Sequence, residues 1–385
     1  MNKPINFAVP NSIEIGTGIV EQLNEKVRKL GGKKVFIITD EGVLKAGLLE
    51  RVKKPLAEGG IKFGCYTKVI PEPPVEQIQE IVNEVKDGGY DLLVGLGGGS
   101  SLDVTKVVSV IVTNGGAIGD YIGTDMVKKP GIAKILIPTT SGTGSEATNI
   151  AILTDVKEEL KKGVVSPYLF ADIALVDPSL TFTVPPKITA NTGMDALIHA
   201  IEAFIAKKSN AFTDCIALEA IKLISDNLRT AVTDGENVEA RYNMSLGSLM
   251  AGIAFGNAGV GAVHALAYPL GGQFHIAHGM ANTLMLRYVM EYNVVSRMAK
   301  FKEIATAMGE NVEGLSPREA AQKAIDAMIG LAEDIGVPTK LRQVDIPKEA
   351  IPKLAEAGIK VTRLLSNNPR KLTLEDIETI YSNAW

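Results

Sequence analysis

An acid and an imidazole lie four residues apart in the segment "TGMDALIHAIEAF", which begins at Thr192. On a helix, Asp195 and His199 would project over the same patch of surface, because four residues are close to one turn. This pair could provide two ligands to a metal ion, or it could be an ordinary surface pair. The remaining histidines of the chain bear on that choice.

All four histidines of the chain lie in its second half. His264 opens an apolar helical pattern in "GNAGVGAVHALAYPLGGQFHIAHGM", and His278 follows in a segment flanked by glycine. A single histidine is usually structural, but histidines concentrated in two glycine-rich helical segments favour a metal site. One carboxylate and three imidazoles suit a divalent ion of the iron or zinc type. The predicted ligands are Asp195, His199, His264 and His278.

Two further polar residues lie close to these ligands in the sequence. His275, three residues before His278, could relay a proton or contact a substrate, or it could be a cation at a helix end. Glu202, about one turn beyond His199, could accept a hydrogen bond from a ligand imidazole. Since glutamates are mostly exposed, we expect Glu202 to be a solvated helix residue.

An apolar run leads into three glycines, two serines and a helical pattern in "LLVGLGGGSSLDVTK". Glycines let a backbone approach a ligand closely, and a helix that starts at the loop offers unpaired N–H groups. Residues 97–100 are therefore predicted to bind a pyrophosphate. A tight turn without a ligand is the alternative, because the loop lacks the GxGxxG pattern.

A second small-residue loop, "IPTTSGTGSEATN", follows another apolar run and could hold the rest of a nucleotide, or it could be a flexible loop with a helix cap. Asp40 ends an earlier run, in "IITDEG". Its carboxylate could accept hydrogen bonds from a ribose diol and repel a 2′-phosphate, which would favour NAD over NADP. A helix cap is the alternative role for Asp40.

Between residues 34 and 176, short β-branched runs alternate with amphipathic helical patterns. This alternation predicts a mostly parallel sheet with helices on both faces. Two further runs, at 150–155 and 161–166, could pair as a hairpin. The predicted strands of the sheet are 34–40, 61–69, 91–99 and 133–140.

The strand pattern stops after "LVDPSLTFTVPPK", where prolines cluster, and from residue 187 the periodicity is almost entirely helical. We therefore predict two domains. Residues 1–183 would form an α/β dinucleotide-binding domain with a Rossmann-like, mostly parallel sheet. Residues 184–385 would form an all-α metal-binding and catalytic domain.

The composition is that of an ordinary globular protein. Of 385 residues, 46% are hydrophobic, which is enough for a large core. The formal net charge is only -4 and no Lys/Arg block stands out, so we expect no nucleic-acid partner. We expect no signal peptide, because the N-terminus "MNKPINFAVPNS" lacks an apolar core, and no membrane span, because no apolar run reaches about 18 residues. Two distant cysteines, Cys65 and Cys215, suit a reducing cytoplasm.

These motifs, in this order and approximate spacing, resemble the iron-containing (group III) alcohol dehydrogenase family over nearly the whole chain. The resemblance implies a metal-dependent, NAD(H)-linked alcohol dehydrogenase or aldehyde reductase. Hydride would pass between the nicotinamide and a small primary alcohol or diol whose oxygen binds the metal. The segments that carry the resemblance are "LGGGSSLDVTK", "IPTTSGTGSE", "LVDPSL", "TGMDALIHAIEAF", "NAGVGAVHALAYPLGG" and "FHIAHGMAN".

The resemblance also implies a set of functional residues. The metal would be Fe2+, although Zn2+ or Mn2+ suits the same ligands. Relatives are commonly dimers or larger, so we expect a homo-oligomer. His275 and Asp103 are the candidate catalytic residues, with Asp103 near the nicotinamide. The positions matched to the metal are Asp195, His199, His264 and His278, and those matched to NAD are Asp40, Gly97, Gly98, Gly99, Ser100, Asp103, Thr139, Thr140, Lys162 and Leu180.

Two positions depart from the family pattern. Tyr268 stands where many relatives have histidine, which leaves open a proton relay through that position. Glu72, between Pro71 and Pro73, stands where relatives often have asparagine, and this leaves open the contact to the nicotinamide ribose.

Three alternative functions follow from the same residues. A lyase of the dehydroquinate synthase type shares the fold, the glycine loop and the use of NAD with a metal, but it needs basic residues in the metal site, and the segments around the ligands contain none. A zinc-dependent glycerol dehydrogenase is a closer alternative, although its pattern lacks one of the four ligands. In a noncatalytic protein, NAD and metal would only stabilise the fold.

Overall fold

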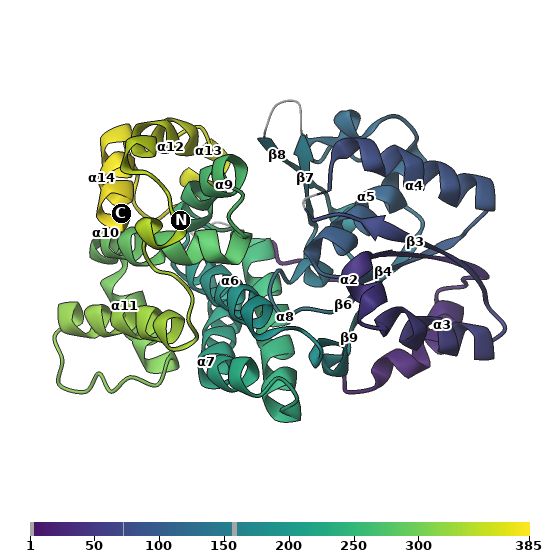
Figure 1. The fold of residues 1–385 in the computed structure, drawn as a ribbon, viewed down its shortest axis with the longest axis horizontal. Coiled ribbons are helices and arrows are strands. Elements are labelled where there is room, and N and C mark those ends of the chain that lie inside the picture. Colours follow the sequence, from purple (N-terminus) through teal and green to yellow (C-terminus); the bar gives the residue numbers. More distant parts are fainter. Residues whose placement is uncertain (1–3, 72, 156–159) are drawn as a thin grey trace. The chain divides into compact units, whose positions relative to one another are not determined.

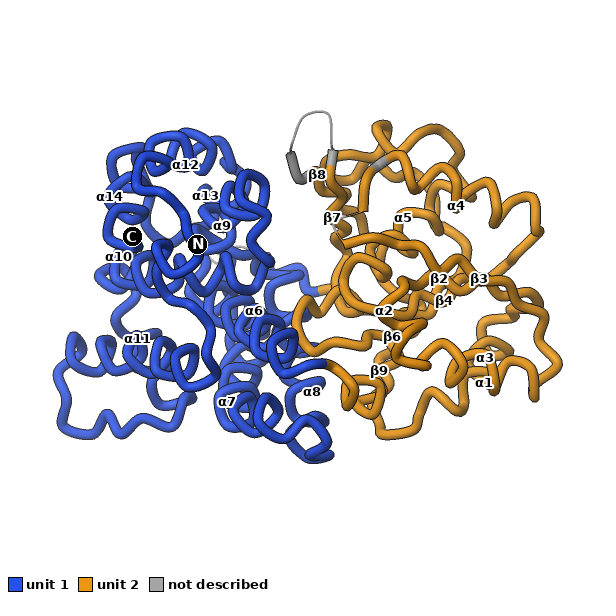
Figure 2. Tube along the Cα trace, viewed as in Figure 1, with its two compact units in different colours: residues 1–7, 185–385 blue, residues 8–184 orange. Residues whose placement is uncertain are grey.

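The structure is a computed structural model that describes residues 4–71, 73–155 and 160–385. It divides into two compact units, shown in Figure 1 and coloured separately in Figure 2. One unit is Ala8–Val184, and the other contains residues 185–385 together with 4–7. The sequence-based division places residues 4–7 in the first domain, whereas the structure groups them with the helices. Phe7 stacks on Phe212 there, with ring centroids 5.6 Å apart.

The first unit is built on a six-stranded sheet whose described neighbours all pair in parallel, as the sequence predicts. Its spatial order is β1-β9-β6-β4-β2-β3. Four of the strands match the predicted runs, while β1 and β9 were not predicted as separate strands. In chain order they are β1 (Ile13–Ile15), β2 (Lys34–Asp40), β3 (Lys62–Val69), β4 (Leu92–Gly97), β6 (Ala133–Pro138) and β9 (Ile173–Val176).

Helices cover both faces of this sheet. Val35 and Ile37 of β2 enter one apolar cluster with α1 and α3, whereas Phe36 and Ile38 enter another with α4 and α5. Successive side chains of a strand point to opposite faces, so β2 is buried on both faces, whereas the edge strand β3 keeps exposed residues. The helices of this unit are α1 (Leu23–Lys29), α2 (Glu41–Lys45), α3 (Leu48–Glu58), α4 (Val75–Gly88) and α5 (Gly99–Asn114).

A smaller three-stranded sheet has the order β5-β8-β7. It contains the predicted hairpin, in which β7 (Ile150–Asp155) and β8 (Leu160–Val165) pair antiparallel. The short strand β5 (Gly123–Thr124) pairs parallel with β8. The hairpin is therefore confirmed as a pair of strands.

The second unit is helical in its described residues, also as predicted. Its first helix, α6, is buried along most of its length, which accounts for the apolar composition on several sides. The helices are α6 (Pro186–Ile205), α7 (Ala211–Thr233), α8 (Val238–Ala258), α9 (Ala262–Phe274), α10 (His278–Ala307), α11 (Pro317–Asp334), α12 (Ile351–Gly358), α13 (Thr362–Leu365) and α14 (Leu374–Ala384).

Among the described residues, no single helix has the length and hydropathy of a membrane span. The consecutive helices α8 and α9 meet those criteria only as a pair, and they are bent by 104° relative to one another.

Candidate metal centre and nucleotide loops

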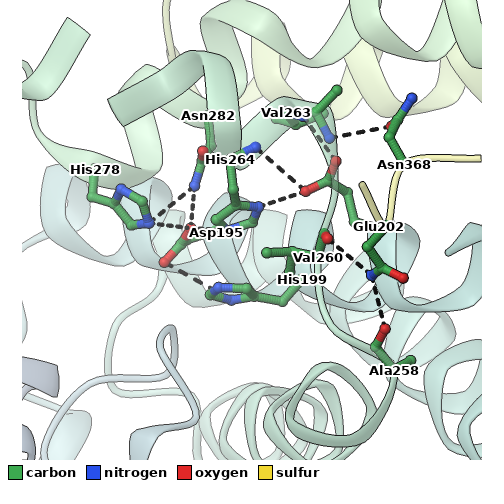
Figure 3. A network of polar contacts seen from close by, with 12 residues as sticks. Asp195, His199, Glu202, Ala258, Val260, Val263, His264, His278, Asn282 and Asn368 are labelled. Carbon is green, nitrogen blue, oxygen red and sulfur yellow. Dashed lines mark hydrogen bonds and ion pairs between the residues drawn. The ribbon is translucent and has the colours of Figure 1, made fainter. Parts of the chain in front are cut away.

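The four predicted ligands converge on one point in the helical unit (Figure 3). One potential ligand atom of each lies within 4.8 Å of the others. Oδ1 of Asp195 is 3.7 Å from Nε2 of His264 and 3.8 Å from Nε2 of His278, and its Oδ2 is 4.0 Å from Nδ1 of His199. The first three ligands are buried and His278 is partly exposed.

Three helices supply these side chains. Asp195 and His199 lie one turn apart on α6, His264 lies in the first turn of α9, and His278 is the first residue of α10. The start of α10 packs tightly on α6. A Cβ on Gly279 would collide there with the backbone carbonyl oxygen of Asn191. Glycine at this position therefore allows His278 to approach Asp195.

Glu202 is part of this centre and is not the solvated residue that the sequence predicts. Its side chain is almost fully buried. Oε2 lies 2.7 Å from Nδ1 of His264, and Oε1 accepts a hydrogen bond of 2.8 Å from the backbone N–H of Val263. The prediction of a solvated position failed because α9 begins against α6 at this point, a tertiary contact that helix periodicity does not reveal.

Asn282 is a second member of the centre, and sequence reasoning did not single it out. Its Nδ2 donates to Oδ1 of Asp195 at 2.7 Å and lies 3.3 Å from Nε2 of His278. The available signal was its position four residues after His278, which places both residues on one face of α10.

Charge is concentrated in this buried region. Burial raises the pKa of the Asp195 carboxyl, but the positive charge that His199, His278 and His264 can carry outweighs burial and holds that pKa well below its usual range. Burial lowers the pKa of His264, yet the neighbouring carboxylates of Asp195 and Glu202 raise it to about 9. The centre therefore combines an ionised carboxylate with surroundings that favour positive charge.

The residues fit a divalent ion. Nε2 of His264 is buried and has no hydrogen-bond partner in the described part of the chain, as expected for a ligand atom. Metal–ligand bonds of about 2.0–2.2 Å allow ligand separations up to roughly 4.4 Å. Small side-chain rotations would bring the observed cluster within that range.

Aromatic side chains and His275 lie around the cluster in different ways. The ring of Phe255 stacks on His199 with centroids 4.2 Å apart, and the ring of Tyr268 lies 6.1 Å from that of His278. His275 is exposed, caps the end of α9 with φ 55°, and does not belong to the group of four.

The glycine loop lies between β4 and α5 in the first unit. Gly97 has φ 149°, and a Cβ there would lie 2.8 Å from Oδ2 of Asp40 and 2.7 Å from Oγ of Ser101. Gly98 at the N-cap supplies no side chain to the first N–H groups of α5, so an anion could bind them. Ser100 lies in that first turn.

Asp40, which lies beside Gly97, also caps α2, the helix that follows β2. Its Oδ1 accepts a hydrogen bond of 3.1 Å from the N–H of Val43, and its Oδ2 accepts one of 3.0 Å from Oγ of Ser101. The geometry therefore allows both predicted roles of Asp40, the helix cap and the contact to a ribose, because the capping carboxylate lies beside Gly97.

The other predicted nucleotide contacts are spread over the same unit. The N–H of Thr139 donates to the carbonyl oxygen of Gly97 at 3.0 Å, and Oγ1 of Thr140 faces Gly98. Leu180 is fully buried in the apolar cluster that contains Val43. Lys162 lies on β8 opposite Leu153. Glu72, the predicted departure near the nicotinamide ribose, lies outside the described residues.

Both halves of the chain match families of known proteins. Residues 10–178 match the family described as iron-containing alcohol dehydrogenase. Residues 189–385 match the family described as Fe-containing alcohol dehydrogenase, C-terminal. The chain belongs to the iron-containing alcohol dehydrogenase family.

Relatives of this family cover almost the whole chain. Long-chain-alcohol dehydrogenase 1 of Geobacillus thermodenitrificans is 44% identical over 98% of the chain and 95% of its own length. NAD-dependent methanol dehydrogenase of Bacillus methanolicus is 38% identical over 98% of the chain and 99% of its own length. A crystal structure of 1,3-propanediol oxidoreductase is 37% identical, has a TM-score of 0.97 and covers 100% of both chains.

This iron-containing alcohol dehydrogenase is therefore an oxidoreductase that interconverts alcohols and aldehydes. The lyase, glycerol dehydrogenase and noncatalytic alternatives are not favoured, because its relatives are dehydrogenases and reductases of alcohols and aldehydes.

Proposed function

We propose that Asp195, His199, His264 and His278 hold a single divalent ion that is required for the dehydrogenase reaction. The convergence of one carboxylate and three imidazoles from three helices carries this proposal. Such a ligand set suits Fe2+, Zn2+ and Mn2+. The description of the family as iron-containing supports Fe2+ as the natural ion.

The side chains around the ligands have distinct tasks in this proposal. When bound, a divalent ion would act as a Lewis acid toward the substrate oxygen and lower the pKa of an alcohol hydroxyl. Glu202 orients His264, and Asn282 holds one oxygen of Asp195. Phe255 covers one face of His199 and keeps water from it.

NAD(H) is the proposed hydride carrier. The pyrophosphate would bind the N–H groups at residues 97–100, and Asp40 would contact the adenosine ribose and disfavour NADP. Thr139, Thr140, Lys162 and Leu180 are proposed as further nucleotide contacts. A sulfoacetaldehyde reductase from Bifidobacterium kashiwanohense, solved in complex with NAD+, supports this cofactor with 30% identity and a TM-score of 0.90 over 100% of this chain and 99% of its own.

The proposed substrate is a small uncharged primary alcohol or diol, or the matching aldehyde. The rings next to the ligands, those of Phe255 and Tyr268, are uncharged and would not pair with a carboxylate or phosphate. His275 is exposed and could exchange a proton with solvent, so we assign it as the candidate proton relay.

We also propose a cytoplasmic homo-oligomer, a dimer or larger. Cys65 and Cys215 are both free and exposed, which supports a reducing compartment. We further propose that the unit Ala8–Val184 binds the nucleotide and that the helical unit, residues 185–385, holds the metal.

Steady-state assays with purified enzyme test the function. Under anaerobic conditions, NADH and NADPH oxidation are followed against short aldehydes, hydroxyaldehydes and a carboxylated aldehyde of the same length. We expect turnover of uncharged aldehydes with NADH as the preferred cofactor. No turnover with any aldehyde by metal-loaded enzyme would contradict the proposal, and preference for the carboxylated compound would overturn the substrate class.

A further inference from the structure

A fully buried lysine with no part in the proposed chemistry lies on the helix that begins at the glycine loop. Lys106 is on α5, and none of its side chain is exposed. Its Nζ donates hydrogen bonds of 2.7 Å to Oγ of Ser145, 3.1 Å to Oγ1 of Thr148 and 2.7 Å to the carbonyl oxygen of Ile150. This ammonium is therefore surrounded by acceptors that belong to other segments.

Asp103, one turn earlier on α5, completes the network. Its Oδ1 lies 3.3 Å from Nζ of Lys106 and accepts a hydrogen bond of 2.5 Å from Oγ of Ser145. Its Oδ2 accepts one of 2.8 Å from the backbone N–H of Ile152. Both oxygens of Asp103 are thus engaged by the protein itself, which leaves little capacity for proton transfer.

The network joins three segments that are separate in the chain. Lys106 and Asp103 follow the glycine loop on α5, whereas Ser145 lies in the second small-residue loop. Ile150 and Ile152 belong to β7, whose partner strand β8 carries Lys162. The predicted nucleotide contacts on both loops and on the hairpin are therefore fixed relative to one another through one ion pair.

The physical cost of this arrangement indicates a specific role. Burial lowers the pKa of Lys106, which reflects the cost of removing an ammonium from water. A buried ion pair adds little to stability compared with an apolar core, but its hydrogen bonds require one arrangement of their partners. A lysine at this position is best explained by the geometry that it imposes on the loops.

We propose that Lys106 is a positioning residue of the nucleotide site and that Asp103 acts with it, by holding the second loop and the β7–β8 hairpin against the glycine loop. The inference rests on the proposed binding of NAD(H) by these loops. It assigns Asp103 to positioning and gives Lys106 a role in cofactor affinity.

The test compares two buried lysines of the same unit. Lys106→Met removes the ammonium and keeps an unbranched side chain as far as the ε position. Lys134→Met is the matched control, because Lys134 is also buried and its Nζ lies 3.8 Å from Asp172. Lys134 lies at the start of β6, whereas Thr139 follows the end of that strand. The dissociation constant for NADH is measured by fluorescence titration of each metal-loaded protein.

We expect Lys106→Met to weaken NADH binding about tenfold or more relative to Lys134→Met, the scale of a lost hydrogen bond to a charged group. Metal content should be equal in both variants, since the predicted ligands lie in the other unit. Amide exchange of residues 150–154 should accelerate only in Lys106→Met. Equal NADH affinity in the two variants would overturn the proposal.

A second variant covers the case in which Lys106→Met does not fold. Ser145→Ala removes one hydroxyl from the network, and we expect it to weaken NADH binding. Where the double variant with Lys106→Met folds, the two losses of NADH affinity should not add, because both residues belong to one hydrogen-bond network. Unchanged affinity in Ser145→Ala would contradict the inference. Failure of the unmodified enzyme to bind NADH would instead refute the proposed function on which the inference rests.

Discussion

The carboxylate of Glu202 lies 2.7 Å from Nδ1 of His264, and this contact determines which nitrogen of the imidazole faces the other candidate ligands. A carboxylate accepts hydrogen bonds, so the proton of a neutral His264 belongs on Nδ1. Nε2 then carries the lone pair that a metal ion needs.

Glu202→Gln should lower metal affinity by about 10- to 100-fold. One amide oxygen cannot accept from both Val263 N–H and His264 Nδ1–H, which bond to different oxygens of the glutamate. The dissociation constant for Zn2+, measured by competition with a chelator, checks this. Glu303→Gln, at an exposed position on α10, is the matched control. Equal affinity in the two variants would mean that Glu202 serves only to pack α9 on α6.

His278→Ala should abolish metal retention, whereas His275→Ala should keep the metal. The first removes a member of the cluster and the second removes a nearby exposed imidazole outside it. Metal content after gel filtration distinguishes the two, and NADH fluorescence shows that the nucleotide unit is intact. Full metal content in His278→Ala would contradict the ligand set.

Asp40→Asn should raise the ratio of kcat/KM for NADP to that for NAD by about tenfold, the effect of about 1.4 kcal/mol of lost repulsion. Asparagine can keep the cap on Val43 and the contact to Ser101, so this variant isolates the charge. Asp40→Gly removes both. A ratio that changes in the glycine variant alone would show that the cap, and not the charge, sets the preference.

Glu146 should make the free energy of unfolding depend on pH. Burial raises its pKa from 4.5 to about 7. Between these two values the unfolded state ionises while the folded state stays protonated, so stability is present below pH 4.5 and is lost as pH rises to about 7. The loss is about 3 kcal/mol.

Glu146→Gln removes that loss, so its stability relative to the unmodified protein should increase from pH 5 to pH 8. Urea midpoints at the two pH values measure the difference. The same comparison for Glu303→Gln, which is exposed, should show no such trend. Parallel behaviour of the two variants would indicate that Glu146 is ionised in the folded protein.

Much of the fold follows from local pattern. The runs that became β2, β4 and β6 are apolar because both faces of the sheet are covered there, so they stand out in the sequence. The edge strand β3 is partly exposed and has a mixed composition. The three residues of β1 are only half-buried, and they form a strand because they pair with β9. Such a short edge strand carries no pattern of its own, and it becomes visible only in the folded sheet.

The site divides in the same way. Asp195 and His199 share a helix face, so their spacing indicated a pair. The concentration of the other histidines in glycine-rich segments added His264 and His278, and the resemblance matched all four to the metal. Glu202 belongs to the centre only because α9 starts against α6. The role of Lys106 likewise depends on Ser145 and β7, which are distant in the chain and bring acceptors that no local motif reveals.

Reconstitution of the metal-free enzyme is the most direct test of the metal requirement. The protein is stripped with a chelator and titrated anaerobically with Fe2+, Zn2+ or Mn2+, while metal content and NADH-dependent aldehyde reduction are measured on the same samples. We expect activity to rise in proportion to occupancy and to reach its limit at about one ion per chain, with His264→Ala inactive throughout. Full activity in the stripped enzyme, or a limit reached equally by His264→Ala, would contradict the metal requirement.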